Sequence, residues 1–271
     1  MIFNMPEGNS NIAIVSTVIN FDLYAKSSAF FPQDIQKYVI DGRNGMYGIE
    51  SIFYIMKKLK NKNLEWLIMA DEDVIFQDAT VVFDIINHMK IENYTVCGVR
   101  DGGVIKHRVF NPFVINTFFS IINFKELEIM WDKKEIIKNN YLLNNEFNDN
   151  LTNIMGQYDL KSLFEPYYCF YLWLRRKNKK ILFLNAEMNE DEITNSVLYK
   201  GKVFLYHTWF ARAYGNNEQH TSRINNIFNL LNFEESKTSD PIIFKDKKFF
   251  LIKKIEKNYK RIIRRIYKSN K

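Results

Sequence analysis

Three consecutive acidic residues, Asp71–Asp73, follow a mostly apolar run at residues 65–70 and precede a second apolar stretch, Val74–Phe76. An apolar run of this length, bounded by charge, predicts a buried strand. Asp71 and Asp73 would then leave its carboxyl end, where open α/β sheets bind their ligands. Carboxylate pairs of this kind suit Mg²⁺ or Mn²⁺ bound to a diphosphate, and such a metal neutralises the charge that develops on a departing nucleoside diphosphate.

The Asp-x-Asp pattern carries little weight by itself. The chain has 14 Asp in 271 residues, and a chain of this composition yields about 0.7 such patterns by chance. The structural alternative is a polar corner between a strand and a loop. The surrounding elements must therefore decide between the two interpretations.

Hydrophobic periodicity predicts strands that alternate with helices, which is typical of a doubly wound α/β sheet. The Asp101–Gly103 segment, with two adjacent glycines after a strand, predicts a turn or a mobile loop. The predicted strands are 11–18, 37–42, 65–70, 94–99, 180–184 and 202–206, with further strands within 109–122. The predicted helices are 47–60, 79–90 and 166–177, the last with Pro166 at its first position.

Length and composition indicate a folded enzyme-sized chain. A hydrophobic content of 46% in 271 residues is enough for one large α/β domain, which we place at residues 1–240. Cys97 and Cys169 are too few and too far apart for a disulfide framework or a zinc site, so we expect a reducing compartment. Residues 1–10 do not resemble a signal peptide, and no uncharged run approaches the roughly 20 residues of a membrane span.

The positive charge is concentrated at the end of the chain. The net charge is +7, but Lys247–Lys271 contains eleven basic residues and one acid, which leaves −3 for the rest. Isoleucines and Tyr259 recur there at helical spacing, so residues 241–271 are predicted to form a basic amphipathic tail. Such a helix fits an anionic membrane surface, and nucleic acid is the less favoured partner because the body is acidic. A plain solvated helix is the structural alternative.

The combined pattern resembles the GT-A glycosyltransferases over residues 10–215. The resemblance rests on three early strands, of which the second ends at Asp41 and the third at the Asp-x-Asp, and on the late sequence 207–209, His-Thr-Trp, followed by Arg212. The helix segment Leu172–Arg175 is similar to family-2-like bacterial members. The resemblance implies a Rossmann-like, mixed but mostly parallel sheet flanked by helices.

The resemblance also assigns roles to particular residues. It implies that Asp73 binds a divalent metal on the donor diphosphate, that Asp71 contacts the donor sugar or ribose, and that Asp41 contacts the nucleotide base or ribose. His207 would complete the metal site, and Arg212 would face the diphosphate. Each has a structural alternative: a turn residue for Asp41, a core histidine for His207 and a solvated cation for Arg212. Trp209 and Tyr214 could stack on the sugar or base, or simply pack in the core.

The catalytic base is where the chain departs from the family. Inverting relatives place paired acids before the Leu-x-Leu-Arg helix, but Tyr168 and Cys169 occupy those positions. Glu165, one turn earlier, is our candidate base, and its alternative role is to cap the helix. Asp149 and Asp159 are the other candidates. The departure leaves inversion and retention both open.

Together these features predict a glycosyltransferase that uses Mn²⁺ or Mg²⁺ and moves a sugar from a nucleotide-diphosphate sugar to an acceptor hydroxyl. The acceptor would be a lipid-linked or other glycan in bacterial surface glycan assembly, with the enzyme peripheral at the cytoplasmic face of the membrane. The alternatives are a nucleotidyltransferase, which should show a basic glycine-rich loop near its N-terminus, and a non-enzymatic membrane- or nucleic-acid-binding protein.

Overall fold

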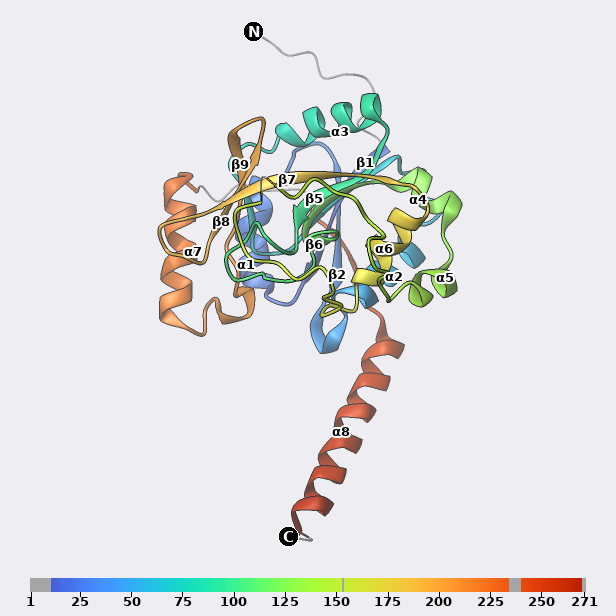
Figure 1. Cartoon of the computed structure of the whole chain (residues 1–271). Helices are drawn as coiled ribbons and strands as arrows, with labels where there is room; N and C mark the ends of the chain where they lie inside the picture. The colour runs from blue at the N-terminus through green and yellow to red at the C-terminus, as the bar shows by residue number, and fades with distance from the viewer. Residues whose placement is uncertain (1–10, 153, 234–239, 270–271) are drawn as a thin grey trace.

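A ten-stranded sheet with strand order β10-β2-β1-β3-β6-β5-β7-β8-β9-β4 runs through the computed structural model, which describes residues 11–152, 154–233 and 240–269 (Figure 1). The strands are β1 Ile12–Val18, β2 Gln36–Asp41, β3 Trp66–Ala70, β4 Val74–Phe76, β5 Tyr94–Arg100, β6 Ile115–Asn123, β7 Lys180–Met188, β8 Asn195–Tyr199, β9 Lys202–His207 and β10 Ile242–Phe244. The α-helices are α1 Phe21–Ser27, α2 Ile49–Leu59, α3 Val81–Glu92, α4 Phe124–Met130, α5 Lys133–Lys138, α6 Tyr168–Arg176, α7 Glu218–Leu230 and α8 Lys247–Ser269. Short 3₁₀ turns are η2 Ser28–Phe30, η3 Arg43–Gly45 and η4 Ala211–Ala213.

The mixed sheet flanked by helices is confirmed, but parallel pairing does not dominate it. Parallel pairs join β10, β2, β1 and β3 on one side, and β5 to β7 further along. The remaining pairs are antiparallel, because β6 is inserted between β3 and β5 and because β7, β8 and β9 follow one another through short connections. The prediction of a mostly parallel sheet was therefore wrong for the second half of the chain.

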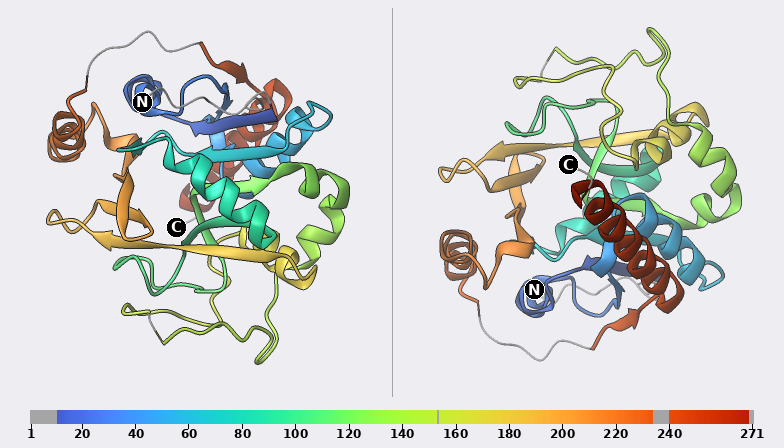
Figure 2. Two further views of the ribbon diagram at one scale, coloured as in Figure 1. Left: turned by 90° about the horizontal axis from the view of Figure 1, so that it is seen from above. Right: turned by 90° about the horizontal axis from the view of Figure 1, so that it is seen from below.

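The helices cover both faces of the sheet. On β1, Ala13 and Val15 pack in a core cluster with α2 and α6, whereas Ile12 and Ile14 pack in a second cluster with α3. Strands that are buried on both faces read as continuous apolar runs, which is why β1 and β3 were recognisable from sequence. The views from above and below show the sheet between these helical layers (Figure 2).

The strand directions bring one set of ends together. β1, β2 and β3 are parallel, so their carboxyl ends lie at the same edge of the sheet. β6 runs antiparallel to both β3 and β5, so its first residues lie where those two strands end, with Ala70 opposite Phe119 and Arg100 opposite Ile115. The acidic segment after β3, the residue after β5 and the start of β6 are therefore neighbours.

The end of the chain returns to the sheet before it leaves the body. β10 pairs in parallel with β2, and α8 then projects away from the molecule (Figure 1). The division of the chain at residue 240 stays a prediction. No helix in the described part of the chain is long and apolar enough to cross a bilayer. Pro166 lies outside α6, two residues before its start, and not at its first position as predicted.

Candidate functional site

A large cleft of about 1940 Å³ opens at the edge where β3 ends. Its walls come from the loop after β3, the β6 start, the η3–α2 connection, the segment before α6, η4 and α8. Among the sequence-predicted site residues, it gathers Asp71, Asp73, Glu165 and Arg212. Arg108, which the sequence did not indicate, lines the same cleft.

The loop after β3 is held to the neighbouring strands through its middle residue. The Glu72 carboxylate accepts hydrogen bonds from the backbone amides of Ile19 and Asn20 at 3.0 and 3.2 Å. The Asp71 amide donates to the Phe118 carbonyl of β6 at 2.9 Å. The variable position of the Asp-x-Asp pattern thus ties the loop to the end of β1 and leaves its two aspartate side chains free of that task.

His207 of β9 lies beside Asp73 because β4 and β9 pair antiparallel with Val74 opposite His207. The His207 Nε2 and the Asp73 Oδ1 are 3.5 Å apart. The imidazole is buried and stacks on Phe118, with ring centres 3.9 Å apart, and packs against Trp209 at 4.1 Å. Two chain segments more than 130 residues apart therefore form one acid–imidazole pair.

Backbone strain marks the turn that follows β9. Trp209 and Phe210 have φ values of 57° and 58°, the left-handed region that bulky residues rarely adopt. Both residues line the cleft. Asn20 holds this turn, since its amide group donates to the carbonyls of Ala211 and Tyr214 at 2.9 Å. Such strain is frequent at ligand sites, where the surroundings keep a side chain in one position.

Two carboxyl groups of the acidic loop, those of Asp71 and Glu72, have raised pKa values. Exclusion of water raises the pKa of Asp71 well above its usual value, and the charges of Glu72 and Asp73 raise it further. Burial, with the charge of Asp73, raises the pKa of Glu72 to about 7 despite its two amide donors. Asp71 and Glu72 therefore resist ionising, and a bound cation would relieve this by favouring their charged forms.

The donor set fits a hard or borderline divalent cation. Carboxylate oxygens and an imidazole nitrogen are ligands that Mn²⁺ accepts, and carboxylates suit Mg²⁺. The buried His207 Nδ1 has no hydrogen-bond partner in the described structure, so this ring is not held there as a satisfied core histidine. Within residues 11–152, 154–233 and 240–269, no group of three or more acidic, histidine or cysteine side chains is gathered closely enough to bind a metal alone. Further ligands would have to come from water or from a diphosphate.

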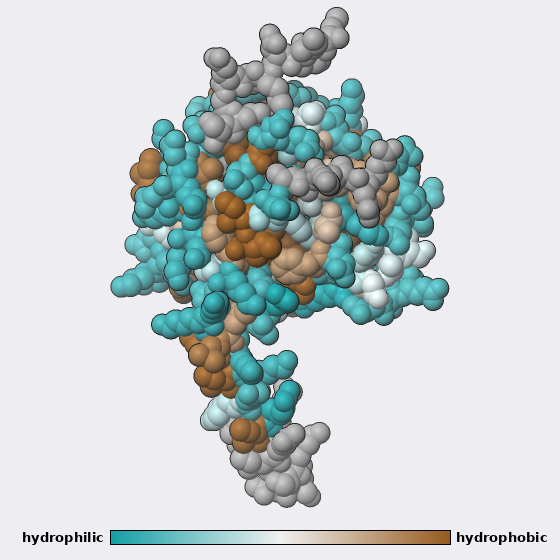
Figure 3. All heavy atoms as spheres, turned by 180° about the vertical axis from the view of Figure 1, so that it is seen from behind, coloured by the Kyte–Doolittle hydropathy of each residue, from teal (hydrophilic) through white to brown (hydrophobic). Residues whose placement is uncertain are grey.

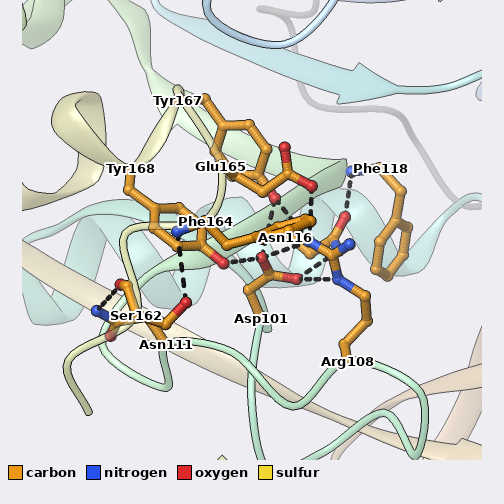
Figure 4. Close-up of polar contacts among 10 residues, drawn as sticks. All are labelled: Asp101, Arg108, Asn111, Asn116, Phe118, Ser162, Phe164, Glu165, Tyr167 and Tyr168. Carbon is orange, nitrogen blue, oxygen red and sulfur yellow. Dashed lines mark hydrogen bonds and ion pairs between the residues drawn. The ribbon is translucent and has the colours of Figure 1, made fainter. Parts of the chain in front are cut away.

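A second acidic centre lies at the end of β5. Asp101 is fully buried, and its carboxylate accepts two hydrogen bonds from Arg108, both 2.7 Å, and one from Asn116 at 2.6 Å. The hydroxyls of Tyr167 and Tyr168 also donate to it. Figure 4 shows these four side chains converging on Asp101 from the β5–β6 connection, from β6 and from the start of α6. We call this group the Asp101 cluster.

The Asp101 cluster places the Arg108 guanidinium beside the Glu165 carboxylate. The Arg108 guanidinium reaches the Glu165 carboxylate at 3.1 Å while it remains paired with Asp101. Burial alone would lower the pKa of Arg108, but the hydrogen bonds and charge of Asp101 outweigh it and raise the pKa. Burial and then the charge of Asp101 likewise raise the pKa of Tyr167 and Tyr168, so both stay neutral donors. Arg108, which is itself held by Asp101, thus positions Glu165 at the cleft wall.

The other predicted donor-site residues are placed differently from one another. Arg212 is exposed at the cleft, with its guanidinium 4.9 Å from the centre of the Tyr47 ring. The Asp41 carboxylate is buried and is bound by Arg43 at 2.7 and 2.8 Å. It is not among the described residues that line the cleft. Burial opposes ionisation of Asp41, but the hydrogen bonds of Arg43 outweigh it and lower the pKa. A role in reading the nucleotide stays a prediction.

The alternative bases lie away from the cleft. Asp149 is held between Arg100, at 2.8 Å, and Arg175, which contacts both carboxylate oxygens. Arg175 of the Leu172–Arg175 segment is thus engaged in an internal ion pair. Asp159 is exposed, and its carboxylate accepts from the Lys161 amide of its own turn at 2.9 Å.

The two aromatic residues of the predicted site also differ. Trp209 lines the cleft, and its indole nitrogen donates to Asn195 at 2.5 Å. Tyr214 is buried, and its hydroxyl donates to Asn225 at 2.9 Å within a core cluster that includes α7. Of the two, only Trp209 is placed where a sugar or a base could stack on it.

Of the two alternatives predicted for the Asp101–Gly103 segment, a turn or a mobile loop, the structure shows a tightly packed turn. A Cβ at Gly102 would lie 2.1 Å from the Phe110 carbonyl oxygen, and Gly103 has a φ of 82°. Gly102 is therefore required by the close approach of two backbones, and Gly103 by its left-handed backbone conformation. The signal that sequence reasoning missed was positional, because Asp101 follows a strand just as Asp71 does.

Sequence comparison finds no matching family model and no matching curated protein. Among solved structures, the fold resembles A197 from STIV, with a TM-score of 0.40 and 13% identity over 72% of this chain and 93% of that one. It also resembles the glycosyltransferase GlyE of Streptococcus pneumoniae TIGR4 (TM-score 0.35, 11% identity, 85% of this chain and 66% of that one). A third likeness is to the mannosyltransferase PcManGT of Pyrobaculum calidifontis in complex with GDP-Man and Mn²⁺ (0.29, 9%, 46% and 48%). At such scores we argue function from the site itself.

Proposed function

We propose that this protein is a metal-dependent glycosyltransferase that moves a sugar from a nucleotide-diphosphate sugar to an acceptor hydroxyl. The observation that carries the proposal is the pairing of the buried His207 with Asp73, which lines a cleft together with Asp71, Arg212 and Glu165. Acids for a metal, a cation for phosphates and a carboxylate for an acceptor proton are the groups this reaction needs.

The donor end of the cleft is the acidic loop. Asp73 and His207 would hold Mn²⁺ or Mg²⁺, with Asp71 directed at the donor sugar, ribose or a metal-bound water. The metal would neutralise charge on the departing nucleoside diphosphate. Arg212, exposed at the cleft, supplies a further cation for the phosphates, and Trp209 offers a rigid ring surface for the sugar or base.

The acceptor end is organised by Glu165. Its carboxylate lies at the cleft wall and would accept the proton of the attacking hydroxyl. One of its oxygens is paired with Arg108, which fixes the direction of the carboxylate and leaves the other oxygen for the acceptor. Asp101 acts one step behind, since it keeps Arg108 in place without touching the cleft itself. Asp101 is therefore a positioning residue and not a second base.

The same proposal extends to where the enzyme works. The basic segment Lys247–Lys271 supports an acceptor that is presented at an anionic membrane surface, such as a lipid-linked glycan in surface glycan assembly at the cytoplasmic face. The body carries −3 against +10 in this segment, which favours membrane over nucleic acid as the partner.

Calorimetric titration with a panel of nucleoside diphosphates, with and without Mn²⁺, tests the proposal. We expect one diphosphate to bind with Mn²⁺ and to lose about tenfold or more in affinity when EDTA replaces the metal. Asp73→Asn should abolish the metal dependence, while Asp159→Asn, an exposed acid outside the cleft, should leave it unchanged. Metal-independent binding of every member, or none at all, would refute the donor assignment.

A further inference from the structure

The helix α8 presents two different faces to its surroundings. Successive residues of a helix are rotated by about 100°, so residues three or four apart share a face. Phe250, Lys254, Lys257 and Arg261 fall on one stripe, and all four line the cleft. The opposite stripe lines no part of it and is apolar, with exposures from 44% to 64%. Its residues are Ile252, Ile255, Tyr259 and Ile262.

Figure 3 shows this division from behind the molecule, with hydrophobic residues gathered along one side of the projecting helix and hydrophilic residues along the other. We call the two surfaces the cleft face and the outer face of α8. The cleft face ends on Phe250, which packs against the main core, so the orientation of the helix about its own axis is set by packing.

Most of the α8 cations that line the cleft have no acidic partner among the described residues. In the described structure, Lys253 pairs with Glu256 at 3.0 Å, whereas Lys254, Lys257, Lys260 and Arg261 form no ion pair. All four of these side chains are exposed and border the cleft. The cleft is thus polarised, with carboxylates at the β3 end and a row of free cations along α8.

Solubility alone does not explain how the cations and the apolar residues are distributed around α8. A helix that needed cations simply for solubility would distribute them around the side that faces water, yet here the water-facing outer side is apolar. Cations gathered on a concave wall instead raise the local concentration of an anionic ligand. The acidic loop has a separate role in the proposed function, because it would bind the donor diphosphate through a metal.

We propose that the cleft face of α8 binds the diphosphate of a lipid-linked acceptor. This inference rests on the proposed function and names the class of its acceptor. Lys254, Lys257, Lys260 and Arg261 contact the acceptor phosphates, and the outer face of the same helix contacts the apolar phase in which the acceptor is anchored. An amphiphile with an anionic head and an apolar tail satisfies both faces of α8 at once.

Geranyl diphosphate is a water-soluble probe of this site. Its affinity for the full-length protein is measured by calorimetry without divalent metal, and geraniol, which lacks the phosphates, is the uncharged comparison. The cleft-face variant Lys254→Gln/Lys257→Gln/Arg261→Gln should weaken geranyl diphosphate binding about tenfold, since exposed ion pairs each contribute modestly. A matched control, Lys62→Gln/Lys134→Gln/Lys202→Gln, removes the same charge from exposed positions of the body and should change nothing.

The outer-face variant Ile252→Ser/Ile255→Ser/Ile262→Ser separates the two surfaces. It should keep geranyl diphosphate affinity and lose binding to vesicles of phosphatidylcholine with one third phosphatidylglycerol. Unchanged diphosphate affinity in the cleft-face variant would overturn the proposal. A cleft-face variant that loses only vesicle binding would also overturn it, because the cations would then bind lipid headgroups.

A third outcome distinguishes this proposal from the donor site. If the cleft-face variant loses Mn²⁺-dependent nucleoside diphosphate binding as strongly as geranyl diphosphate binding, α8 serves the donor and the acceptor assignment is wrong. Failure of nucleotide binding in the wild-type protein would instead refute the glycosyltransferase proposal, while the metal-free geranyl diphosphate measurement would still report on α8.

Discussion

Two acidic centres lie at the same edge of the sheet, and they differ in how many donors they have. Asp101 accepts hydrogen bonds from Arg108, Asn116, Tyr167 and Tyr168. In the described structure, no donor bonds to the Asp71 side chain, and Asp73 has only the His207 ring, at 3.5 Å. A buried acid without donors is costly, so a fold retains one where a ligand supplies the missing charge. The fully hydrogen-bonded Asp101 stabilises the site, whereas Asp71 and Asp73 remain available to bind a ligand.

The contrast predicts opposite responses to the same isosteric change. Asp73→Asn should reduce sugar transfer by about a thousandfold, because it removes a charged ligand from a metal that stabilises the leaving group by several kcal/mol. Its melting temperature should stay within a degree or two of wild type, or rise, since carboxylate repulsion in the loop is relieved. Transfer rates and thermal unfolding of the purified variant test both. Retained transfer at wild-type rate would contradict the role of Asp73.

Asp101→Asn should instead be a folding variant. It removes the fully buried carboxylate that binds Arg108 through two hydrogen bonds and leaves only Glu165, at 3.1 Å, as its counter-charge. Breaking a buried pair in this way costs about 3–5 kcal/mol of unfolding free energy. Chemical denaturation measures the loss, and the affinity for the nucleoside diphosphate should survive in the fraction that is folded. A stable Asp101→Asn protein with lost nucleotide binding would reverse the comparison and make Asp101 part of the binding site.

Glu165 is intermediate between the two centres, because it lines the cleft and only one of its oxygens has a hydrogen-bond donor in the described structure. Glu165→Gln keeps the shape and an acceptor for Arg108 but removes the base. We expect turnover to fall by about a hundredfold with unchanged donor affinity, which is the usual loss for a general base. Asp159→Asn is the control at a competing candidate. Normal turnover in Glu165→Gln would move the base elsewhere or indicate a retaining mechanism.

The smallest expected effect sharpens the role of His207. His207→Phe keeps the ring that stacks on Phe118 and removes both nitrogens. Affinity for the nucleoside diphosphate with Mn²⁺ should fall about tenfold, which is typical of losing one ligand or its supporting group. Stability should change little, because the stacked ring is retained. A large drop in melting temperature with unchanged affinity would assign His207 to the core.

The elements that sequence predicted best are those with a local signal. β3 is a fully buried apolar run, β1 is almost fully buried and mostly apolar, and α2 shows the spacing of a helix with one buried side. Such patterns follow from burial of each element itself, so a single window of sequence contains them. The placement of Asp71–Asp73 followed directly from β3 for the same reason.

Features that depend on partners distant in sequence could not be predicted. Asp101 depends on Tyr167 and Tyr168, more than 60 positions away, and Asp149 depends on Arg100 and Arg175. Antiparallel insertion of β6 between β3 and β5 was equally invisible, because its apolar sequence fits either direction. Through these long-range contacts Asp149, a candidate base, is engaged in internal ion pairs, whereas Asp101, which the sequence placed only in a turn, supports the site.

α8 is connected to the sheet through β10. β10 is hydrogen-bonded to β2, and α8 begins three residues later with Asp246 bonded to the Phe249 amide at 2.9 Å. The helix is therefore attached to the sheet by a short, structured joint and not by a slack tether. Whatever surface α8 rests on, the body is held above it at one inclination. The mouth of the cleft would then face that surface in every encounter, so that an acceptor diffusing in two dimensions meets the reacting groups without a search over orientations.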